Sequence, residues 1–245
     1  MTKAVSWQVY STQYDVMAIH NPAYHEIKDR LRAFIRKEAI PDGATIADIG
    51  AGTGNYSAMI AAALPRSSIL HIEPNEGMNQ VARAKRQREG LINLDIRQHV
   101  AGELLFPAGS LNGVVLVHSL YAIPRPLDLV ARIHEWVCDG GFVFACDIGR
   151  IMNVNDWFWY IGRHLLSRYG VRRTIQLLYG NREVARQNRH VARSQRRGEF
   201  WLHSPAEYRN AWEERGFVIE HEEVMYRGYS DLIIARKPLS SALAG

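Results

Sequence analysis

Three glycines recur at every second position within Thr45–Ser57, which reads TIADIGAGTGNYS. They come after a short apolar run that ends at Asp48, and an amphipathic stretch, Tyr56–Leu64, follows them. This order predicts a strand, a tight glycine turn and a helix. Such a turn lets bare backbone approach a ligand beside the N-terminus of the helix, where backbone N–H groups are free. The segment is therefore a candidate ligand-binding turn.

The spacing of these glycines discriminates between cofactors. A dinucleotide-binding turn has the pattern G-x-G-x-x-G/A, whereas here Gly50, Gly52 and Gly54 alternate and Asn55 takes the place of the last small residue. A second apolar run, Ser68–Glu73, also ends in an acid. In a nucleotide-binding βαβ unit, an acid about 20 residues beyond the glycines accepts hydrogen bonds from the ribose hydroxyls. The glycine spacing disfavours a dehydrogenase.

Together the two motifs resemble the opening motifs of class I S-adenosylmethionine (SAM) methyltransferases. The resemblance implies SAM as the cofactor, S-adenosylhomocysteine (SAH) as its product, and no metal ion. It also implies that the turn passes beneath the methionine and ribose portions, that Asp48 holds the turn, and that Glu73 binds the ribose diol. Met78, on the first turn of the next helix, would pack under the adenine ring. The cofactor-binding residues expected on this basis are Tyr14, Asp48, Gly50, Ala51, Gly52, Gly54, Glu73, Pro74, Met78, Val100, Ala101, Gly102 and His118.

The segment His99–Ser110 departs from the family pattern at one position. It resembles the family segment Asp-Ala-Glu-x-Leu-Pro-Phe, but Val100 stands where an Asp contacts the adenine amino group. Backbone at Ala101 and Gly102 could replace that hydrogen bond. After the fourth expected strand the chain reads HSLY, and not the Asn/Asp-Pro-Pro-aromatic signature of methyltransferases that act on nucleobase or glutamine amino groups. A nucleic-acid substrate is therefore less expected than a small molecule.

Three residues are candidates for catalysis: His118, Tyr14 and His20. His118 ends an apolar run, and sheets of this kind bind ligands at the carboxyl ends of their strands. A neutral imidazole there could take a proton from a hydroxyl or ring N–H group, and the alternative is a packed histidine. In family members a helical N-terminal segment folds over the cofactor, which would let Tyr14 face the sulfonium through cation–π attraction. The alternative is an N-terminal helix that buries its aromatic side chains.

Short apolar runs alternate with helical patterns over most of the chain, which predicts parallel strands covered on both faces. The expected strands are Thr45–Ile49, Ser68–Glu73, Ile92–Gln98, Gly113–His118 and Gly141–Asp147. The expected helices are Tyr24–Glu38, Tyr56–Ala63, Gly77–Gln87, Pro126–Val137, Asn181–Gln195 and Ser204–Arg215. Gly216–Tyr226 and Tyr229–Lys237 read as a closing hairpin, which matches the antiparallel last strand of the family. The prediction is an α/β fold with a Rossmann-like, doubly wound sheet of seven strands.

The length favours one domain over residues 1–245, with a helical N-terminal cover at 1–40 and an inserted helical lid at 150–201. Eleven arginines stand against three acids between Arg150 and Glu199, a surplus of eight positive charges in a chain of net charge +5. Family insertions at this place commonly cover the substrate. The inserted segment could also pack on the sheet edge or on the second subunit of a homodimer.

The inserted segment carries four consecutive aromatic residues, Trp157 to Tyr160. Rings of this kind make a flat apolar slot that suits a planar ligand. The sequence therefore predicts methyl transfer to oxygen or nitrogen of a small aromatic or heterocyclic metabolite in specialised metabolism. Two alternatives stay open: an RNA or tRNA methyltransferase that uses the basic segment, and a SAM-binding protein without turnover. The candidate acceptor contacts are Tyr10, Tyr121, Trp157, Tyr160 and His203.

Nothing in the sequence indicates a membrane or secreted protein. No run approaches the ~18 continuous apolar residues of a membrane span, and the N-terminus lacks the apolar region of a signal peptide. Cys138 and Cys146 are predicted to be reduced thiols in apolar surroundings. A cytoplasmic protein is expected.

Overall fold

Residues 15, 18–180 and 182–239 are described by the computed structural model. They contain a seven-stranded sheet with the order β3-β2-β1-β4-β5-β7-β6. Strands β1 to β5 are parallel, and β7 runs antiparallel to both of its neighbours. This confirms the predicted Rossmann-like, doubly wound sheet with an antiparallel last strand. The strands are β1 Thr45–Ile49, β2 Ser68–Ile72, β3 Leu94–Arg97, β4 Leu111–Val117, β5 Val137–Ile148, β6 Val218–Met225 and β7 Ser230–Arg236.

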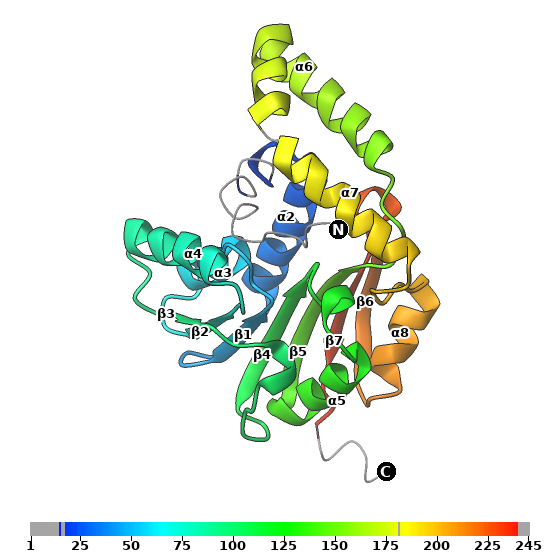
Figure 1. Cartoon of the computed structure of the whole chain (residues 1–245). Coiled ribbons are helices and arrows are strands. Elements are labelled where there is room, and N and C mark those ends of the chain that lie inside the picture. The colour runs from blue at the N-terminus through cyan, green and yellow to red at the C-terminus, as the bar shows by residue number, and fades with distance from the viewer. Residues whose placement is uncertain (1–14, 16–17, 181, 240–245) are drawn as a thin grey trace.

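Helices cover both faces of this sheet (Figure 1). On one face lie α2 (Pro22–Lys37) and α3 (Asn55–Ala63), with α4 (Glu76–Glu89) beside α3. On the other face lie α5 (Pro126–Trp136) and α8 (Pro205–Glu213). Strand β4 is buried along nearly its whole length because helices cover it on both sides. Within the described ranges, no helix combines the length and apolar character that a bilayer crossing requires.

Side-chain caps fix where the helices around the sheet begin. The Asn75 side chain accepts a hydrogen bond from Met78 N at 3.1 Å, which places the N-cap of α4 two residues after Glu73. Ser204 and Glu207 form a reciprocal capping box at the start of α8. The cap of α4 therefore also holds the chain that follows β2 in a defined position.

The chain between β5 and α8 forms two further helices, α6 (Val154–Gly180) and α7 (Arg182–Arg196). Both lie beyond the carboxyl ends of the parallel strands (Figure 1). The first is interrupted at Gly170, whose φ of 72° lies in the left-handed region that favours glycine. We refer to residues 150–201 as the insertion. Its helices share an apolar cluster with the sheet edge, and their members of that cluster are Trp157, Ile161, Leu165, Leu177, Val191 and Ala192.

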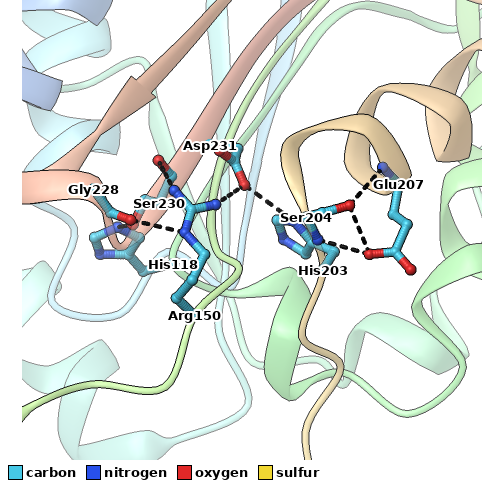
Figure 2. A network of polar contacts seen from close by, with 8 residues as sticks. All are labelled: His118, Arg150, His203, Ser204, Glu207, Gly228, Ser230 and Asp231. Atoms are coloured by element: carbon cyan, nitrogen blue, oxygen red, sulfur yellow. Dashed lines mark hydrogen bonds and ion pairs between the residues drawn. The ribbon is translucent and has the colours of Figure 1, made fainter.

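Asp231 on β7 contacts both ends of the insertion (Figure 2). Arg150, at the start, forms an ion pair with the Asp231 carboxylate and donates from Nε to the Gly228 carbonyl oxygen at 2.7 Å. His203, just after the end, places Nδ1 3.2 Å from Asp231 Oδ2. The backbone N–H of His203 also donates to the Gly149 carbonyl oxygen at 3.1 Å. The insertion therefore leaves the sheet and rejoins it at neighbouring points.

Candidate functional site

A cavity of about 640 Å³ lies at the carboxyl ends of β1, β2 and β4 and extends under the insertion. Strands β1 and β4 are neighbours in the sheet although β2 and β3 separate them in the chain. This is the topological switch point at which open α/β sheets bind ligands. Among the described residues, no cluster of three or more His, Cys, Asp or Glu could hold a metal ion. The residues that follow these strands and line the cavity are Gly50, Ala51, Gly52, Glu73, Pro74, His118 and Ser119.

The turn after β1 requires glycine for two different reasons. Gly50, Gly52 and Gly54 have φ values of 72°, 56° and 77°, which other residues rarely adopt. A Cβ at Gly50 would also stand 2.4 Å from Cβ of Ser119, and one at Gly54 would stand 3.0 Å from Cβ of Ala82. Gly54 does not line the cavity. Gly52 does, and a Cβ there would meet no protein atom within 4 Å, so a side chain would occupy the space of a ligand.

Glu73 lines the cavity, and each of its two carboxylate oxygens already accepts one hydrogen bond from backbone. Its Oε2 accepts from Gly52 N at 3.0 Å, and its Oε1 accepts from Asn75 N at 2.9 Å. Each oxygen keeps a second lone pair, so the carboxylate can still accept hydrogen bonds from a diol. Burial raises the pKa of this carboxyl, and the two backbone N–H groups oppose that shift. Pro74 and Met78 line the cavity beside it.

Asp48 also lines the cavity, although it is only 1 % exposed. The sequence predicts that this carboxyl holds the glycine turn, but the structure connects it to α3. Its Oδ2 lies 2.5 Å from Oγ of Ser57, which is itself fully buried. Burial raises the pKa of Asp48 to about 7. This carboxyl therefore carries its proton far more readily than an exposed aspartate does.

His118 directly follows β4 and adopts a positive φ of 52°, which is uncommon for a residue other than glycine. Its Nε2 lies 2.9 Å from Oγ of Ser230, and its ring meets the ring of Tyr226 edge to face at 4.5 Å between centres. Burial lowers the pKa of His118 to about 4. The ring is therefore neutral at pH 7 and lines the cavity as a potential proton acceptor.

The segment after β3 contributes Val100 and Ala101 to the cavity, together with His99. Val100 is 46 % exposed, so an apolar side chain stands where the family carries an Asp. Gly102 does not line the cavity, and its carbonyl oxygen accepts a hydrogen bond from Arg132 at 2.8 Å. Among the described residues, this part of the site therefore offers backbone, apolar surface and the His99 imidazole but no carboxylate.

Two of the expected acceptor contacts lie away from the cavity. The side chain of His203 is fully buried, where its ring stacks on Tyr208 at 4.3 Å between centres. Tyr160 lies under the guanidinium group of Arg227, which is 4.1 Å from the ring centre. Neither residue lines the cavity. The structure therefore does not bring His203 and Tyr160 to the site.

The remaining candidates divide between the cavity and the N-terminal region. Tyr121 and Trp157 line the cavity as expected. His20 does not line it and contacts Tyr169 on α6, with 5.4 Å between the ring centres. Burial and the arginines nearby lower the pKa of His20. Tyr10 and Tyr14 lie outside the described residues.

Sequence reasoning missed several polar residues that line the cavity, and Asn188, Arg189 and Tyr226 are among them. Tyr226 follows β6, which runs parallel to β5 because β7 is antiparallel to both, so it reaches the same edge of the sheet. Its hydroxyl accepts a hydrogen bond from Nδ2 of Asn21 at 3.1 Å. The predicted parallel sheet and closing hairpin were therefore enough to predict that Tyr226 lies at the same edge of the sheet as the cavity. Asn188 and Arg189 depend on how α7 is oriented, which the sequence pattern does not fix.

Comparison with known proteins agrees with this geometry. The family model described as a methyltransferase domain matches residues 20–222. The chain belongs to this methyltransferase family. A curated relative, the demethylmenaquinone methyltransferase of Listeria welshimeri, is 23 % identical over 163 residues, which cover 64 % of this chain and 69 % of the relative.

Solved structures show that the methyltransferase has the class I fold. A chain of the complex between the Haloferax volcanii Trm112 methyltransferase activator and a methyltransferase matches with a TM-score of 0.63 and 13 % identity, over 97 % of this chain and 100 % of that one. Magnesium protoporphyrin IX methyltransferase from Synechocystis PCC 6803, solved with bound SAH, matches with a TM-score of 0.60 and 14 % identity. That match covers 88 % of this chain and 84 % of the other.

Proposed function

We propose that this methyltransferase transfers the methyl group of SAM to an oxygen or nitrogen atom of a small aromatic or heterocyclic metabolite. One observation carries the proposal: a single cavity extends from the glycine turn to residues of α6 and α7. Its volume of about 640 Å³ lies within the range of about 300–1,000 Å³ that ligand pockets occupy. A cofactor and a small acceptor could therefore share one space.

The residues at the sheet end of the cavity fit SAM. SAM would supply a methyl group on a positively charged sulfur, which is already activated for transfer. Glu73 would bind the ribose diol through its remaining lone pairs, and Gly52 leaves room for the ligand beside the turn. Met78 would pack against the adenine ring. Holding the reactants in line is the main task of the protein, and such positioning can supply about 7–11 kcal/mol of the barrier.

His118 is the residue proposed to accept a proton from the acceptor. Its ring lines the cavity and is neutral at pH 7, because burial lowers its pKa to about 4. A neutral imidazole can take the proton of a hydroxyl or ring N–H group as that atom gains its methyl group. The hydroxyl of Ser230, 2.9 Å from Nε2, would hold the ring in one orientation.

The insertion is proposed to act as a lid that recognises the acceptor. Trp157 and Phe158 line the cavity from α6 and would stack on a planar ring. Arg189 lines it from α7, and among the described residues it has no ion-pair partner. An unpaired guanidinium group at the wall of an apolar cavity suits a carboxylate or carbonyl oxygen on the ligand. The acceptor would therefore carry such a group.

Substitution of single arginines by alanine tests this acceptor site. Isotope-labelled SAM and a small-molecule extract identify the acceptor by its mass shift after incubation with the protein. Arg189→Ala should then raise KM for the acceptor about ten- to a hundredfold, since a hydrogen bond to a charged group contributes about 1.5–3 kcal/mol. The dissociation constant for SAH should stay unchanged.

Arg193→Ala is the matched control for this experiment. Arg193 is exposed one turn further along α7 and does not line the cavity, so its removal changes the charge of the helix equally. It should leave KM unaltered. Equal effects of the two substitutions would show that Arg189 does not contact the acceptor.

The exposed arginines of the insertion favour a second candidate, an RNA or tRNA methyltransferase. Arg172 and Arg173 on α6 and Arg182 and Arg186 on α7 are exposed. Binding of nucleic acid to such a surface weakens steeply with salt because counterions are released. Tight, salt-sensitive binding to tRNA, with methyl incorporation into it, would replace the small-molecule proposal. Binding of SAH without methylation of either class would instead indicate a SAM-binding protein without turnover.

A further inference from the structure

Three buried polar side chains form a chain of contacts beside the glycine turn. They are Asp48 on β1, Ser57 on α3 and His71 on β2. Ser57 Oγ lies 2.5 Å from Asp48 Oδ2 and 3.0 Å from His71 Nδ1. Ser57 and His71 are 0 % exposed and Asp48 is 1 % exposed. The hydrogen atoms in these two contacts must therefore come from the three side chains themselves.

The far side of the His71 ring fixes which nitrogen carries a hydrogen. Asn79 Nδ2 donates to the carbonyl oxygen of Glu73 at 2.9 Å, and a carbonyl oxygen can only accept. The Oδ1 atom of Asn79 therefore faces His71 Nε2, 3.1 Å away. Because Oδ1 also can only accept, Nε2 must carry a hydrogen. A neutral His71 then has its lone pair on Nδ1, toward Ser57.

The two contacts each need one hydrogen atom, so the three side chains together hold one proton more than a carboxylate, a hydroxyl and a neutral imidazole contain. The Ser57 hydroxyl has a single hydrogen, which can serve either Asp48 or His71 but not both. In one arrangement Asp48 is protonated and donates to Ser57, which donates to His71 Nδ1. In the other, His71 Nδ1 is protonated and donates to Ser57, which donates to the Asp48 carboxylate. Both arrangements satisfy every contact and have the same net charge.

We propose that Asp48, Ser57 and His71 share one proton, which resides on Asp48 until the ammonium group of SAM or SAH occupies the cavity beside it. Asp48 then gives its proton to Ser57 Oγ while Ser57 gives its own proton to His71 Nδ1. The products are an Asp48 carboxylate, which faces the ammonium group of the ligand, and a His71 imidazolium. No proton is exchanged with water. His71 is thus a positioning residue for the cofactor. This inference rests on the proposed cofactor.

The surroundings of Asp48 favour its neutral form when no cation is present. Burial is the main cause and, together with the nearby Glu73 carboxyl, raises the pKa of Asp48 to about 7, although hydrogen bonds with Ser57 oppose this shift. Tyr24 on α2 also interacts with Asp48, but it is itself buried, and burial raises the pKa of its hydroxyl far above neutral pH. A cation beside Asp48 reverses this preference, because opposite charges stabilise each other strongly where water is excluded.

The surroundings of His71 likewise favour its neutral form. Burial is the main cause and, together with Lys85 and Arg83 on α4, lowers the pKa of His71 to about 4, although the hydrogen bond with Asn79 opposes this shift. Asp15 weakens the effect of Lys85, since its Oδ2 lies 2.7 Å from Nζ of that lysine. The imidazolium form therefore requires the negative charge that Asp48 acquires in the same step.

Infrared spectroscopy of the ligand-free protein tests the shared proton directly. At about pH 6, where an ordinary aspartate is ionised, we expect a C=O band of a protonated carboxyl that disappears in Asp48→Asn. Asp147→Asn is the control, because Asp147 is a second buried carboxyl whose pKa burial raises. Its band should be separate and should not respond to ligand. Absence of a band that depends on Asp48 would overturn the proposal.

Ligand binding tests where the proton goes. SAH should abolish the Asp48 band and convert His71 to imidazolium in a nitrogen-15 NMR spectrum. 5′-Methylthioadenosine, which keeps the adenine and ribose but lacks the amino-acid portion with its ammonium group, should leave both signals unchanged. Persistence of the Asp48 band with SAH bound would overturn the proposal. Failure of SAH to bind at all would contradict the proposed function, while the ligand-free spectrum would still test the shared proton.

Proton release during binding gives an independent readout. Calorimetry in buffers of different ionisation enthalpy should show that SAH binding at about pH 6 releases almost no proton from the natural protein. His71→Phe removes the internal acceptor, so Asp48 must lose its proton to water and up to one proton should be released. Equal proton release by the two proteins would contradict the shared proton.

Discussion

At the scale of single residues, His118 is the side chain that we propose to accept a proton in this cavity. We expect His118→Ala to lower kcat about a hundredfold or more, because general base catalysis contributes about 10²–10⁴-fold. Because burial lowers its pKa to about 4, the ring keeps its basic form throughout the neutral range and loses it only as pH falls through that value. The acid limb of the kcat profile should therefore lie well below pH 6.5, the ordinary value for histidine.

Ser230, which contacts the His118 ring, supplies the control for this experiment. Ser230→Ala removes the hydroxyl 2.9 Å from Nε2 but keeps the imidazole, so it should lower kcat much less than His118→Ala. Both variants should bind SAH with nearly the natural affinity. An unchanged kcat in His118→Ala would assign the proton transfer to another group, and an acid limb near pH 6.5 would contradict the buried, neutral ring.

At the scale of secondary-structure elements, Asp231 holds the insertion in place. Asp231→Asn removes the charge that Arg150 and His203 contact, which should lower the free energy of unfolding by about 1–3 kcal/mol. We expect hydrogen exchange to rise in α6 and α7 more than in β1, and KM for the acceptor to rise while SAH affinity holds. Mass spectrometry of exchanged peptides measures the first effect.

Asp156→Asn is the same substitution at an exposed ion pair of the insertion. Asp156 accepts a hydrogen bond from Arg227 at 2.7 Å, and its side chain is 40 % exposed. Such pairs contribute about 0–1 kcal/mol, so this variant should change exchange in the insertion only slightly. A uniform rise in exchange over the whole molecule in Asp231→Asn would show that Asp231 stabilises the sheet and not the insertion in particular.

The elements that could be predicted from sequence are those whose own residues determine them. Strand β1 matches its predicted range, because an apolar run between a turn and three glycines leaves few alternatives. Strand β5 begins at Val137, before the predicted Gly141, since Val137 already pairs with Leu111 on β4 across an irregularity in register. Site residues divide in the same way, between those that their own segment positions and those that a distant partner positions. Glu73 lines the cavity as expected, whereas His203 lies elsewhere because its partner is on β7.

At the scale of the whole molecule, the sheet and the insertion each supply one part of the cavity wall. Gly52→Val tests the sheet part: it should cost about 1–2 kcal/mol of stability, because a side chain is unfavourable in the left-handed conformation. It should also abolish SAH binding, since the new side chain occupies ligand space. SAH at a hundredfold excess over its dissociation constant stabilises a protein by about 2.7 kcal/mol, so a thermal shift measures the loss.

Gly90→Val separates these two effects. Gly90 has a φ of 64°, and a Cβ there would meet no protein atom within 4 Å, so the backbone strain of the substitution matches that at Gly52. It lies at the C-cap of α4 and does not line the cavity. This variant should lose similar stability and keep the full thermal shift with SAH. Retention of the shift in Gly52→Val would place the cofactor elsewhere.

The hydrogen bond between His203 N and the Gly149 carbonyl oxygen makes the insertion exchangeable. A segment whose two ends already touch can be replaced by another of different length without moving the strands on either side, since loop closure costs little more for a longer segment. If the insertion recognises the acceptor as proposed, a foreign segment grafted between Gly149 and His203 should give a chimaera with a new acceptor and the original cofactor chemistry. Under that proposal, substrate choice could change through replacement of this one segment, without change in the residues that hold the methyl donor.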